Sequence, residues 1–296
     1  MRKLVVTGSS GFVGRRLVNM AQDEGYEVIG IDLVSDDSLS CKQFVVDLNK
    51  DNIANLIPEG STVIHLASLS TDSLCRENPI LALDSNVTAT ARLMKFSATA
   101  NASQFIFASS EWVYPELVGS ELQFETDSLD LLNLNSLYAM SKQFGESVIR
   151  ATAEIPYWLL RFGIVYGPRK NPGSAPESLA LKVFRGESIE VGSFSTSRRF
   201  IYIDDLVRGI LAAVNAGPDK ASNIPINIAG ADLISLRNVV DTAGEILNLP
   251  VVCSQGSSAP SIRNPDITRA RGLLDWEPKV SFRVGLKDCL EEMQGL

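Results

Sequence analysis

Tyr138 and Lys142 are the residues of this chain whose types and spacing point most directly to catalysis. They form a Tyr-x-x-x-Lys step inside an apolar-periodic segment that continues to Ile149. Residues at positions i and i+4 of a helix share one face, so the phenol and the ammonium group can point into one small volume. A phenol has a reference pKa of about 10, and a fixed neighbouring cation lowers that pKa. The pair is therefore a candidate general acid/base near neutral pH, with a surface Tyr and Lys as the alternative.

A second candidate follows a predicted buried strand over residues 105–108, where Ser109, Ser110 and Glu111 come in succession. Ligands of parallel sheets bind beyond the carboxyl ends of the strands. A hydroxyl there faces the crevice that Tyr138 would enter, and can hold the substrate oxygen whose proton Tyr138 removes. Serine at the end of a strand is also an ordinary turn residue. His65, the single histidine, lies within a buried strand pattern, and we expect it to be structural.

A glycine-rich turn near the N-terminus predicts a dinucleotide site. A short apolar run ends at Gly8, and Gly11 and Gly14 precede a helical pattern. In such a unit a diphosphate sits on the helix N-terminus: Gly8 allows the tight turn, Gly11 a close backbone approach and Gly14 close helix packing. A second strand, predicted over residues 28–32, ends at Asp32, close to the offset of about 20 residues expected for an acid on the adenosine ribose. An acid there disfavours a 2′-phosphate, so NAD is expected rather than NADP, unless Asp32 is an exposed strand-end carboxylate.

The alternation of strands and helices continues through the first half of the chain. Further strands are predicted over residues 44–46, 63–67 and 105–108, a short helix over 53–57, and a long helix from Pro79 to about Thr99. Repeated βα units predict an α/β fold with a Rossmann-like, doubly wound parallel sheet. We assign residues 1–169 to this NAD-binding domain.

The regular alternation ends after Arg169. Residues 170–296 are expected to form mainly a smaller C-terminal substrate-binding lobe, with segments at about 198–230 returning to the first domain. Helices are predicted over residues 178–185, 206–214, 236–247 and 284–293. Asp204 and Asp205 precede the second of these helices, and we interpret them as capping carboxylates.

Composition narrows the classes of partner. The 296 residues carry a net charge of −8, and the sequence pI is about 4.9, which disfavours nucleic acid and anionic lipid as partners. The four cysteines are far apart and form no C-x-x-C step, so neither a disulfide framework nor a metal site is predicted. The N-terminal apolar run is short for a signal peptide, and no membrane-length apolar run is present. We expect a cytoplasmic protein.

The chain resembles the extended short-chain dehydrogenase/reductases, specifically their nucleotide-sugar epimerase and dehydratase group. The resemblance rests on motifs in a fixed order along essentially the whole chain. They are TGSSGFVG at 7–14, Asp32, ASSEWVY at 108–114, YAMSK at 138–142, LRFGIVYGPR at 160–169, RRFIYIDD at 198–205, NIAG at 227–230 and PDITRAR at 265–271.

The resemblance implies a tightly bound NAD and a catalytic set of Ser110, Tyr138 and Lys142. Tyr138 would be the base, Lys142 would hold the nicotinamide ribose and keep Tyr138 acidic, and Ser110 would bind the reacting hydroxyl. The implied cofactor contacts are Gly8, Gly11, Phe12, Val13, Gly14, Asp32, Asp47, Leu48, Leu66, Ala67, Ser68, Asn86, Ser109, Tyr138 and Lys142. Ser110, Glu111, Arg198 and Arg263 are the implied substrate contacts, the two arginines at the diphosphate.

Departures from the family pattern narrow the expected chemistry. Related dehydratases carry Asp-Glu after the catalytic Ser/Thr, and related decarboxylases carry a Glu two positions after it. Here Glu111 and Trp112 occupy those positions, and an indole cannot act as the second carboxylate. Pro115 and Ile164 replace a usual Gly and Asn, which leaves the sugar open.

We therefore expect an NAD-dependent nucleotide-sugar epimerase, most directly at C4, that works through a keto intermediate. A sugar or nucleotide-sugar dehydrogenase/reductase and a 4,6-dehydratase are the enzymatic alternatives, and a non-catalytic NAD-binding sensor is the alternative outside enzymes. The resemblance also implies a homodimer.

Overall fold

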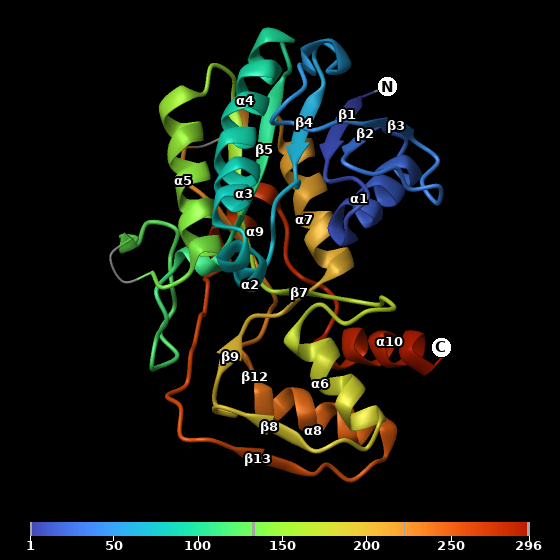
Figure 1. Ribbon diagram of the computed structural model, residues 1–296, viewed down its shortest axis with the longest axis vertical. Coiled ribbons are helices and arrows are strands. Elements are labelled where there is room, and N and C mark those ends of the chain that lie inside the picture. The colour runs from blue at the N-terminus through green and yellow to red at the C-terminus, as the bar shows by residue number, and fades with distance from the viewer. Residues whose placement is uncertain (1, 132–133, 222, 295–296) are drawn as a thin grey trace.

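A seven-stranded parallel sheet forms the centre of the protein in the computed structural model, which describes residues 2–131, 134–221 and 223–294 (Figure 1). Its strand order is β11-β6-β5-β4-β1-β2-β3, and all neighbouring strands are parallel. The strands are β1 Lys3–Thr7, β2 Glu27–Asp32, β3 Lys42–Val45, β4 Thr62–His65, β5 Gln104–Ser110, β6 Tyr157–Phe162 and β11 Ile226–Ile228. Since the order reverses at β1, the predicted doubly wound Rossmann-like sheet is confirmed.

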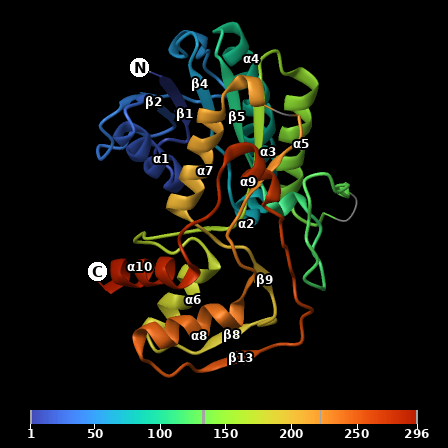
Figure 2. The same cartoon turned by 180° about the vertical axis from the view of Figure 1, so that it is seen from behind.

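Helices cover both faces of this sheet. Successive strand side chains point to opposite faces, so Leu4 and Val6 of β1 pack on one side and Val5 on the other. The first side is covered by α1 Phe12–Asp23, α7 Ile203–Ala216 and α9 Thr268–Leu274, and α7 and α9 lie in front of the sheet in Figure 2. The second side is covered by α4 Ala89–Thr99 and α5 Leu137–Thr152. Burial on both faces explains why these strands are continuous apolar runs.

Several predicted boundaries differ from the observed elements. The long helix before β5 consists of α3 Pro79–Leu83, a π-helical turn η2 Asp84–Thr88 and then α4. The helix predicted over 53–57 is a single 3₁₀ turn, η1 Ala54–Leu56. β4 ends at His65 rather than at residue 67, and β5 runs on to Ser110. Ser109 and Ser110 are therefore the last residues of a strand and do not follow it.

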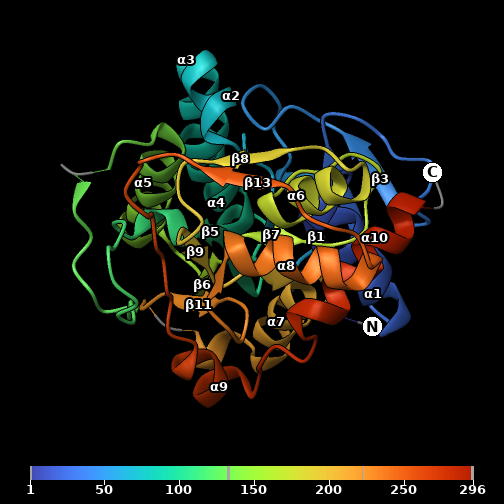
Figure 3. The same ribbon diagram turned by 90° about the horizontal axis from the view of Figure 1, so that it is seen from below.

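A second group of elements lies beyond the carboxyl ends of the strands, at the bottom of Figure 1 and toward the viewer in Figure 3. Its helices are α6 Ala175–Phe184, α8 Leu236–Leu247 and α10 Phe282–Gln294, which share one apolar core. Three two-stranded sheets complete it: β8 Ile189–Val191 with β13 Cys253–Gln255, β9 Ser197–Arg198 with β12 Ile234–Ser235, and β7 Val165–Tyr166 with β10 Ile201–Tyr202. The remaining short elements are α2 Asp72–Glu77, η3 Glu111–Val113 and η5 Pro218–Lys220. Within the described ranges no helix combines the length and apolarity needed to cross a membrane.

Asp204 and Asp205 lie in the first turn of α7, but their side chains do not cap it. Both oxygens of Asp204 accept hydrogen bonds from Arg16 of α1, at 2.6 and 2.7 Å. Asp205 is buried and accepts from the backbone N–H groups of Lys279 and Val280, each at 2.8 Å. The capping interpretation is wrong, because the carboxylates join α7 to α1 and to the segment before α10.

Candidate active site

A cavity of about 860 Å³ opens beyond the carboxyl ends of the central strands. It brings together most of the predicted site residues, from segments far apart in sequence. Those that line it are Gly8, Gly11, Phe12, Val13, Gly14, Asp32, Asp47, Leu48, Leu66, Ala67, Ser68, Ser109, Ser110, Tyr138 and Lys142. Asn86, Glu111, Arg198 and Arg263 are the predicted residues that stand outside this lining.

The glycine-rich turn shapes one end of the cavity. Gly8 has a φ of +73°, and a Cβ there would lie 2.7 Å from the backbone nitrogen of Ala67. A Cβ on Gly14 would collide with the carbonyl oxygen of Gly8. The missing side chains therefore let the N-terminus of α1 come up to the cavity wall with its backbone exposed to a ligand. A diphosphate fits this end, because free helix N–H groups and the helix dipole favour an anion.

Asp32 lies at the end of β2 on the cavity wall. One carboxylate oxygen accepts from the backbone N–H of Ser10 at 2.9 Å, and the other accepts from Leu33 at 2.7 Å. Asp32 thus ties the glycine-rich turn to β2, and each of its oxygens keeps a further lone pair for a ribose hydroxyl. Asp47 and Leu48 line the same end, where Arg92 holds the Leu48 carbonyl at 2.8 Å.

Asn86, which was predicted to contact the cofactor, is buried in the π-helical turn behind the cavity wall. Its side chain donates to the Leu69 carbonyl and to Ser141 Oγ, each at 2.9 Å, and accepts from the Leu69 N–H at 2.7 Å. Asn86 therefore positions the loop after β4. Residues 69–73 of this loop and α2 line the cavity, and the sequence contains no motif that would have identified them.

His65 is fully buried between two threonines. Thr90 Oγ1 donates its only proton to the Asn86 carbonyl, so it accepts from His65 Nε2 at 3.0 Å. His65 Nδ1 then accepts from Thr7 Oγ1 at 2.7 Å. Burial lowers the pKa of the imidazole to about 3, with the Lys142 charge acting in the same direction. His65 is a neutral structural residue, as predicted.

His65 makes the fold sensitive to acid. Its pKa is about 3 in the folded state against 6.5 for the free group, so below pH 6.5 the unfolded chain binds a proton that the folded chain excludes. The stabilisation is present above pH 6.5 and falls as the pH drops, by about 2 kcal/mol at pH 5. Denaturant unfolding at pH 7 and pH 5 should show this loss in the wild type and a clearly smaller loss in His65→Gln. Equal losses of stability in both proteins would show that His65 does not cause the sensitivity to acid.

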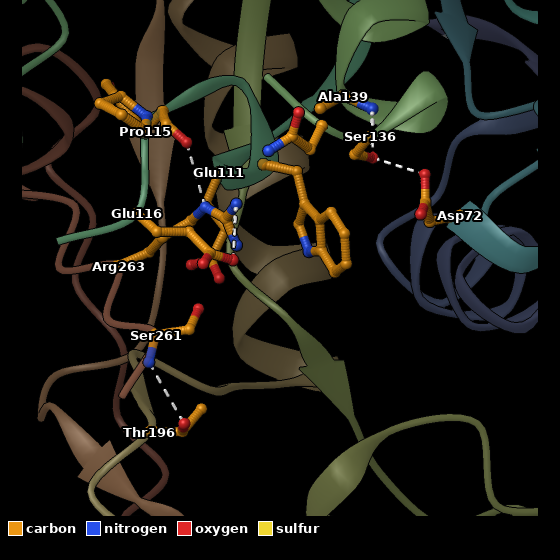
Figure 4. A network of polar contacts seen from close by, with 12 residues as sticks. Asp72, Glu111, Pro115, Glu116, Ser136, Ala139, Thr196, Ser261 and Arg263 are labelled. Carbon is orange, nitrogen blue, oxygen red and sulfur yellow. Dashed lines mark hydrogen bonds and ion pairs between the residues drawn. The ribbon is translucent and has the colours of Figure 1, made fainter. Parts of the chain in front are cut away.

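Tyr138 and Ser110 line the cavity at the carboxyl end of β5. The helix α5 begins at Ser136, whose hydroxyl accepts from the Ala139 N–H at 3.1 Å and donates to Asp72 at 2.7 Å (Figure 4). This cap fixes the first turn of α5, which carries Tyr138. Tyr138 and Ser110 thus both line the cavity, as the sequence predicts for two residues that act at one place.

Burial raises the pKa of Tyr138 to about 12, and the neighbouring Ser110 side chain opposes that rise. The sequence predicts the opposite, a pKa lowered by Lys142. The reason for the difference is that Lys142 Nζ donates to the Ala108 carbonyl at 2.9 Å and lies 5.8 Å from the centre of the Tyr138 ring. Burial also lowers the pKa of Lys142 to about 8. The phenol is therefore protonated at neutral pH in this structure.

A buried polar network supports the site from behind, and it was not predicted. Ser109 donates to Glu146 at 2.6 Å, and Arg161 binds the same carboxylate through two hydrogen bonds of 2.9 Å. Arg161 also donates to the hydroxyl of Tyr114 at 2.9 Å, and that hydroxyl donates to Asn227 at 2.8 Å. The network joins β5, α5, β6 and β11, and so fixes the strand end that carries Ser110 against the helix that carries Tyr138.

Arg198 and Arg263 are buried rather than solvated, and both lie beside Glu111. Arg198 Nε is 3.4 Å from Glu111 Oε1. The exposed Glu116 is 3.4 Å from Arg263 and 3.9 Å from Arg198. The Arg263 guanidinium lies 5.0 Å from the Trp112 ring, and Trp112 lines the cavity. The predicted diphosphate arginines are thus paired with carboxylates, Arg198 with Glu111 and Glu116 and Arg263 with Glu116, and neither lines the cavity.

Comparison with known proteins places this geometry in a family. The family model described as the NAD dependent epimerase/dehydratase family matches residues 4–229. The chain belongs to this family. The predicted resemblance to extended short-chain dehydrogenase/reductases is therefore confirmed, and the cofactor is NAD.

The relatives fall in the nucleotide-sugar branch of the family. YtcB of Bacillus subtilis (strain 168), described as an uncharacterized UDP-glucose epimerase, is 29% identical over 99% of this chain and 98% of its own length. UDP-glucuronic acid decarboxylase 5 of Arabidopsis thaliana is 26% identical, over 96% of this chain and 87% of its own. The structure of MoeE5 with UDP-glucose and NAD has a TM-score of 0.88 and 28% identity, and covers 99% of both chains. MoeE5 has also been solved with UDP-glucuronic acid and NAD.

Proposed function

We propose that this enzyme is a nucleotide-sugar epimerase that inverts the configuration at C4 through a keto intermediate. The observation that carries the proposal is the Ser110–Tyr138 pair at the carboxyl end of β5, on the wall of a cavity whose other end is shaped for a dinucleotide. Relatives that bind or act on UDP-sugars support UDP-glucose or UDP-glucuronic acid as the substrate class.

In this mechanism NAD, when bound, supplies the hydride acceptor and donor. Ser110 holds the reacting sugar hydroxyl, and Tyr138 accepts the proton of that hydroxyl and later returns it. Because burial keeps the Tyr138 pKa near 12, a positive charge must reach the phenol before it can serve as the base. Lys142 Nζ donates to the Ala108 carbonyl and lies 5.8 Å from the centre of the Tyr138 ring, so the mechanism requires its ammonium group to move toward the phenol.

The side chains beside this pair favour epimerisation over elimination. Trp112 lies edge-on to Tyr138, with ring centres 6.0 Å apart, at the position where related decarboxylases and dehydratases carry a carboxylate. An indole N–H cannot remove a proton from a sugar carbon. Glu111 keeps dehydration as the second candidate, but its carboxylate lies against Arg198. With this geometry the keto intermediate is reduced again rather than dehydrated or decarboxylated.

The test is incubation with a panel of UDP-, GDP- and dTDP-sugars, with product configuration followed by NMR and NADH followed by absorbance. We expect one nucleotide sugar to give its C4 epimer with no net change in NADH. Stoichiometric NADH would favour the dehydrogenase/reductase alternative, and a 4-keto-6-deoxy product would favour the dehydratase. An NAD-loaded protein that no nucleotide sugar reduces would favour the non-catalytic sensor.

We also propose the division of labour predicted from the sequence: residues 1–169, with segments of about 198–230, bind NAD, and the rest of 170–296 forms the substrate lobe.

The enzyme is proposed to be a cytoplasmic homodimer that pairs through α5 and the helix before β5. Phe144 of α5 and Ile80 of α3 are large apolar side chains exposed on these helices. Light scattering of the purified chain with and without Phe144→Glu tests the dimer.

A further inference from the structure

Glu111 is a buried carboxylate whose setting the proposed mechanism does not use. It directly follows Ser110, is fully buried, and neither of its oxygens has a hydrogen-bond partner within the described residues. Burying a carboxylate without hydrogen bonds is costly, and it is tolerated here because Arg198 Nε lies 3.4 Å away and the charge of Arg263 also acts on it. Burial raises the pKa of Glu111 to about 7, while the two arginines oppose the rise.

Each of the two arginines lies near both carboxylates; Figure 4 shows Arg263 beside Glu111 and Glu116. On the inner side is Glu111, and on the outer side is the exposed Glu116, 3.4 Å from Arg263 and 3.9 Å from Arg198. Arg263 is held by the Tyr114 carbonyl at 3.1 Å and by the Trp112 ring at 5.0 Å. Arg198 is held by the Ser261 carbonyl and hydroxyl, at 2.5 and 2.6 Å. Two cations and two carboxylates thus neutralise each other.

A diphosphate changes this balance. Its two negative charges can take the place of Glu116, because the Glu116 side chain is 55% exposed and faces solvent on its other side. They cannot take the place of Glu111, which is fixed at the end of β5 and buried. The anion and Glu111 would then share the same two guanidinium groups. Two anions held at one site raise each other's proton affinity, and the carboxyl group takes the proton.

We infer that Glu111 takes up a proton from solvent when the diphosphate of a nucleotide sugar binds Arg198 and Arg263, so that substrate binding is proton-coupled. The inference rests on the proposed function for the presence of a diphosphate. The charged or titratable groups that face Glu111 are Arg198 from β9, Arg263 from the segment before α9, Tyr138 from α5 and, across the arginines, Glu116 from the loop after η3.

The direction of the pH effect follows from linkage. Glu111 has a pKa of about 7 in the free enzyme and a higher pKa in the complex. Above pH 7 the free enzyme must gain a proton to bind, so the Kd rises with pH until the pH reaches the pKa of the complex. If that pKa is 8 or more, the Kd increases by up to about tenfold from pH 6 to pH 8, and roughly half a proton is taken up at pH 7.

Calorimetric titration with UDP-glucose tests this in the NAD-loaded enzyme. Both phosphates of UDP-glucose are esterified, so the ligand does not titrate in this pH range. Buffers with different ionisation enthalpies report the proton uptake at pH 7, and the Kd is measured from pH 6 to pH 8. Repeating the titration in Tyr138→Phe separates binding from the heat of turnover. We expect an uptake of roughly half a proton in both proteins.

Two variants identify the carboxylate responsible. Glu111→Gln keeps the size of the side chain and removes its titration, so its Kd should be flat with pH and its proton uptake absent. Glu116→Gln is the matched control: removal of the competing outer carboxylate should tighten binding while leaving the proton uptake in place. If Glu111→Gln fails to fold, the proton uptake and the pH dependence of the Kd in the wild-type enzyme still test the inference.

The outcomes separate the two proposals. UDP-glucose that binds with a pH-independent Kd and no proton uptake overturns the inference and leaves the epimerase assignment standing. Proton uptake that persists in a folded Glu111→Gln protein also overturns it, and points to Lys142, whose pKa is lowered to about 8. If UDP-glucose, GDP-mannose and dTDP-glucose all fail to bind, no nucleotide-sugar diphosphate reaches the two arginines. Both the inference and the proposed function are then overturned.

Discussion

Replacing Tyr138 by Phe is expected to lower turnover by about 10²–10⁴-fold while NAD stays bound. This is the range typical of a lost general acid or base. The variant keeps the aromatic ring, which packs edge-on against Trp112, and removes only the hydroxyl proposed to act as the base. The measurement is the rate of interconversion of the accepted nucleotide sugar, together with the NAD content of the purified protein.

Tyr26→Phe is the matched control for Tyr138→Phe. The Tyr26 hydroxyl hydrogen-bonds to Asn215 at 2.6 Å, next to α7 and away from the cavity lining. Its removal deletes the same atom from a partly buried phenol without touching the proposed chemistry, so turnover should stay at the wild-type level. Equal turnover in Tyr138→Phe and wild type would refute the assignment of Tyr138 as the base.

Local spacing in the sequence was sufficient to predict most of the elements that position the site. The apolar runs identify the strands because both faces of this sheet are buried. The glycine positions identify the turn because a side chain on Gly8 or Gly14 meets backbone atoms. The i, i+4 spacing places Tyr138 and Lys142 on one helix face. Each of these signals depends on neighbours within a few residues, so the sequence carries it directly.

What could not be predicted depends on contacts between distant segments. Arg198 meets Glu111 across 87 positions of the numbering, and burial, rather than spacing, sets the Tyr138 pKa of about 12. The family resemblance implies diphosphate contacts for Arg198 and Arg263, and the sequence offers no reason to pair them with carboxylates. The family resemblance implies a cofactor contact for Asn86, whereas packing turns its amide toward Leu69 and Ser141.

The second prediction with a large expected effect concerns the buried ion pair between Arg161 and Glu146, behind the active site. Replacing Arg161 by Met is expected to lower the free energy of unfolding by about 3–5 kcal/mol, the usual cost of leaving one member of a buried ion pair without its partner. The side chains of Arg161 and Glu146 are 2% and 0% exposed, so water cannot replace the lost hydrogen bonds. Glu146 would retain only Ser109 and Arg150. Urea or guanidinium unfolding, monitored by circular dichroism, measures the loss.

Restoring charge balance distinguishes the pair from simple packing. In Arg161→Met/Glu146→Leu no buried charge is left unpaired, and replacing both partners of such a pair is often neutral or stabilising. We therefore expect the double variant to be more stable than Arg161→Met, with a coupling energy of the order of 1–3 kcal/mol in the double-mutant cycle. A double variant whose loss equals the sum of the two single losses would show that Arg161 and Glu146 stabilise the fold independently. Since Ser109 hydrogen-bonds to Glu146 and precedes Ser110, the stable double variant should still lose turnover, because the strand end that carries Ser110 is then no longer tied to α5.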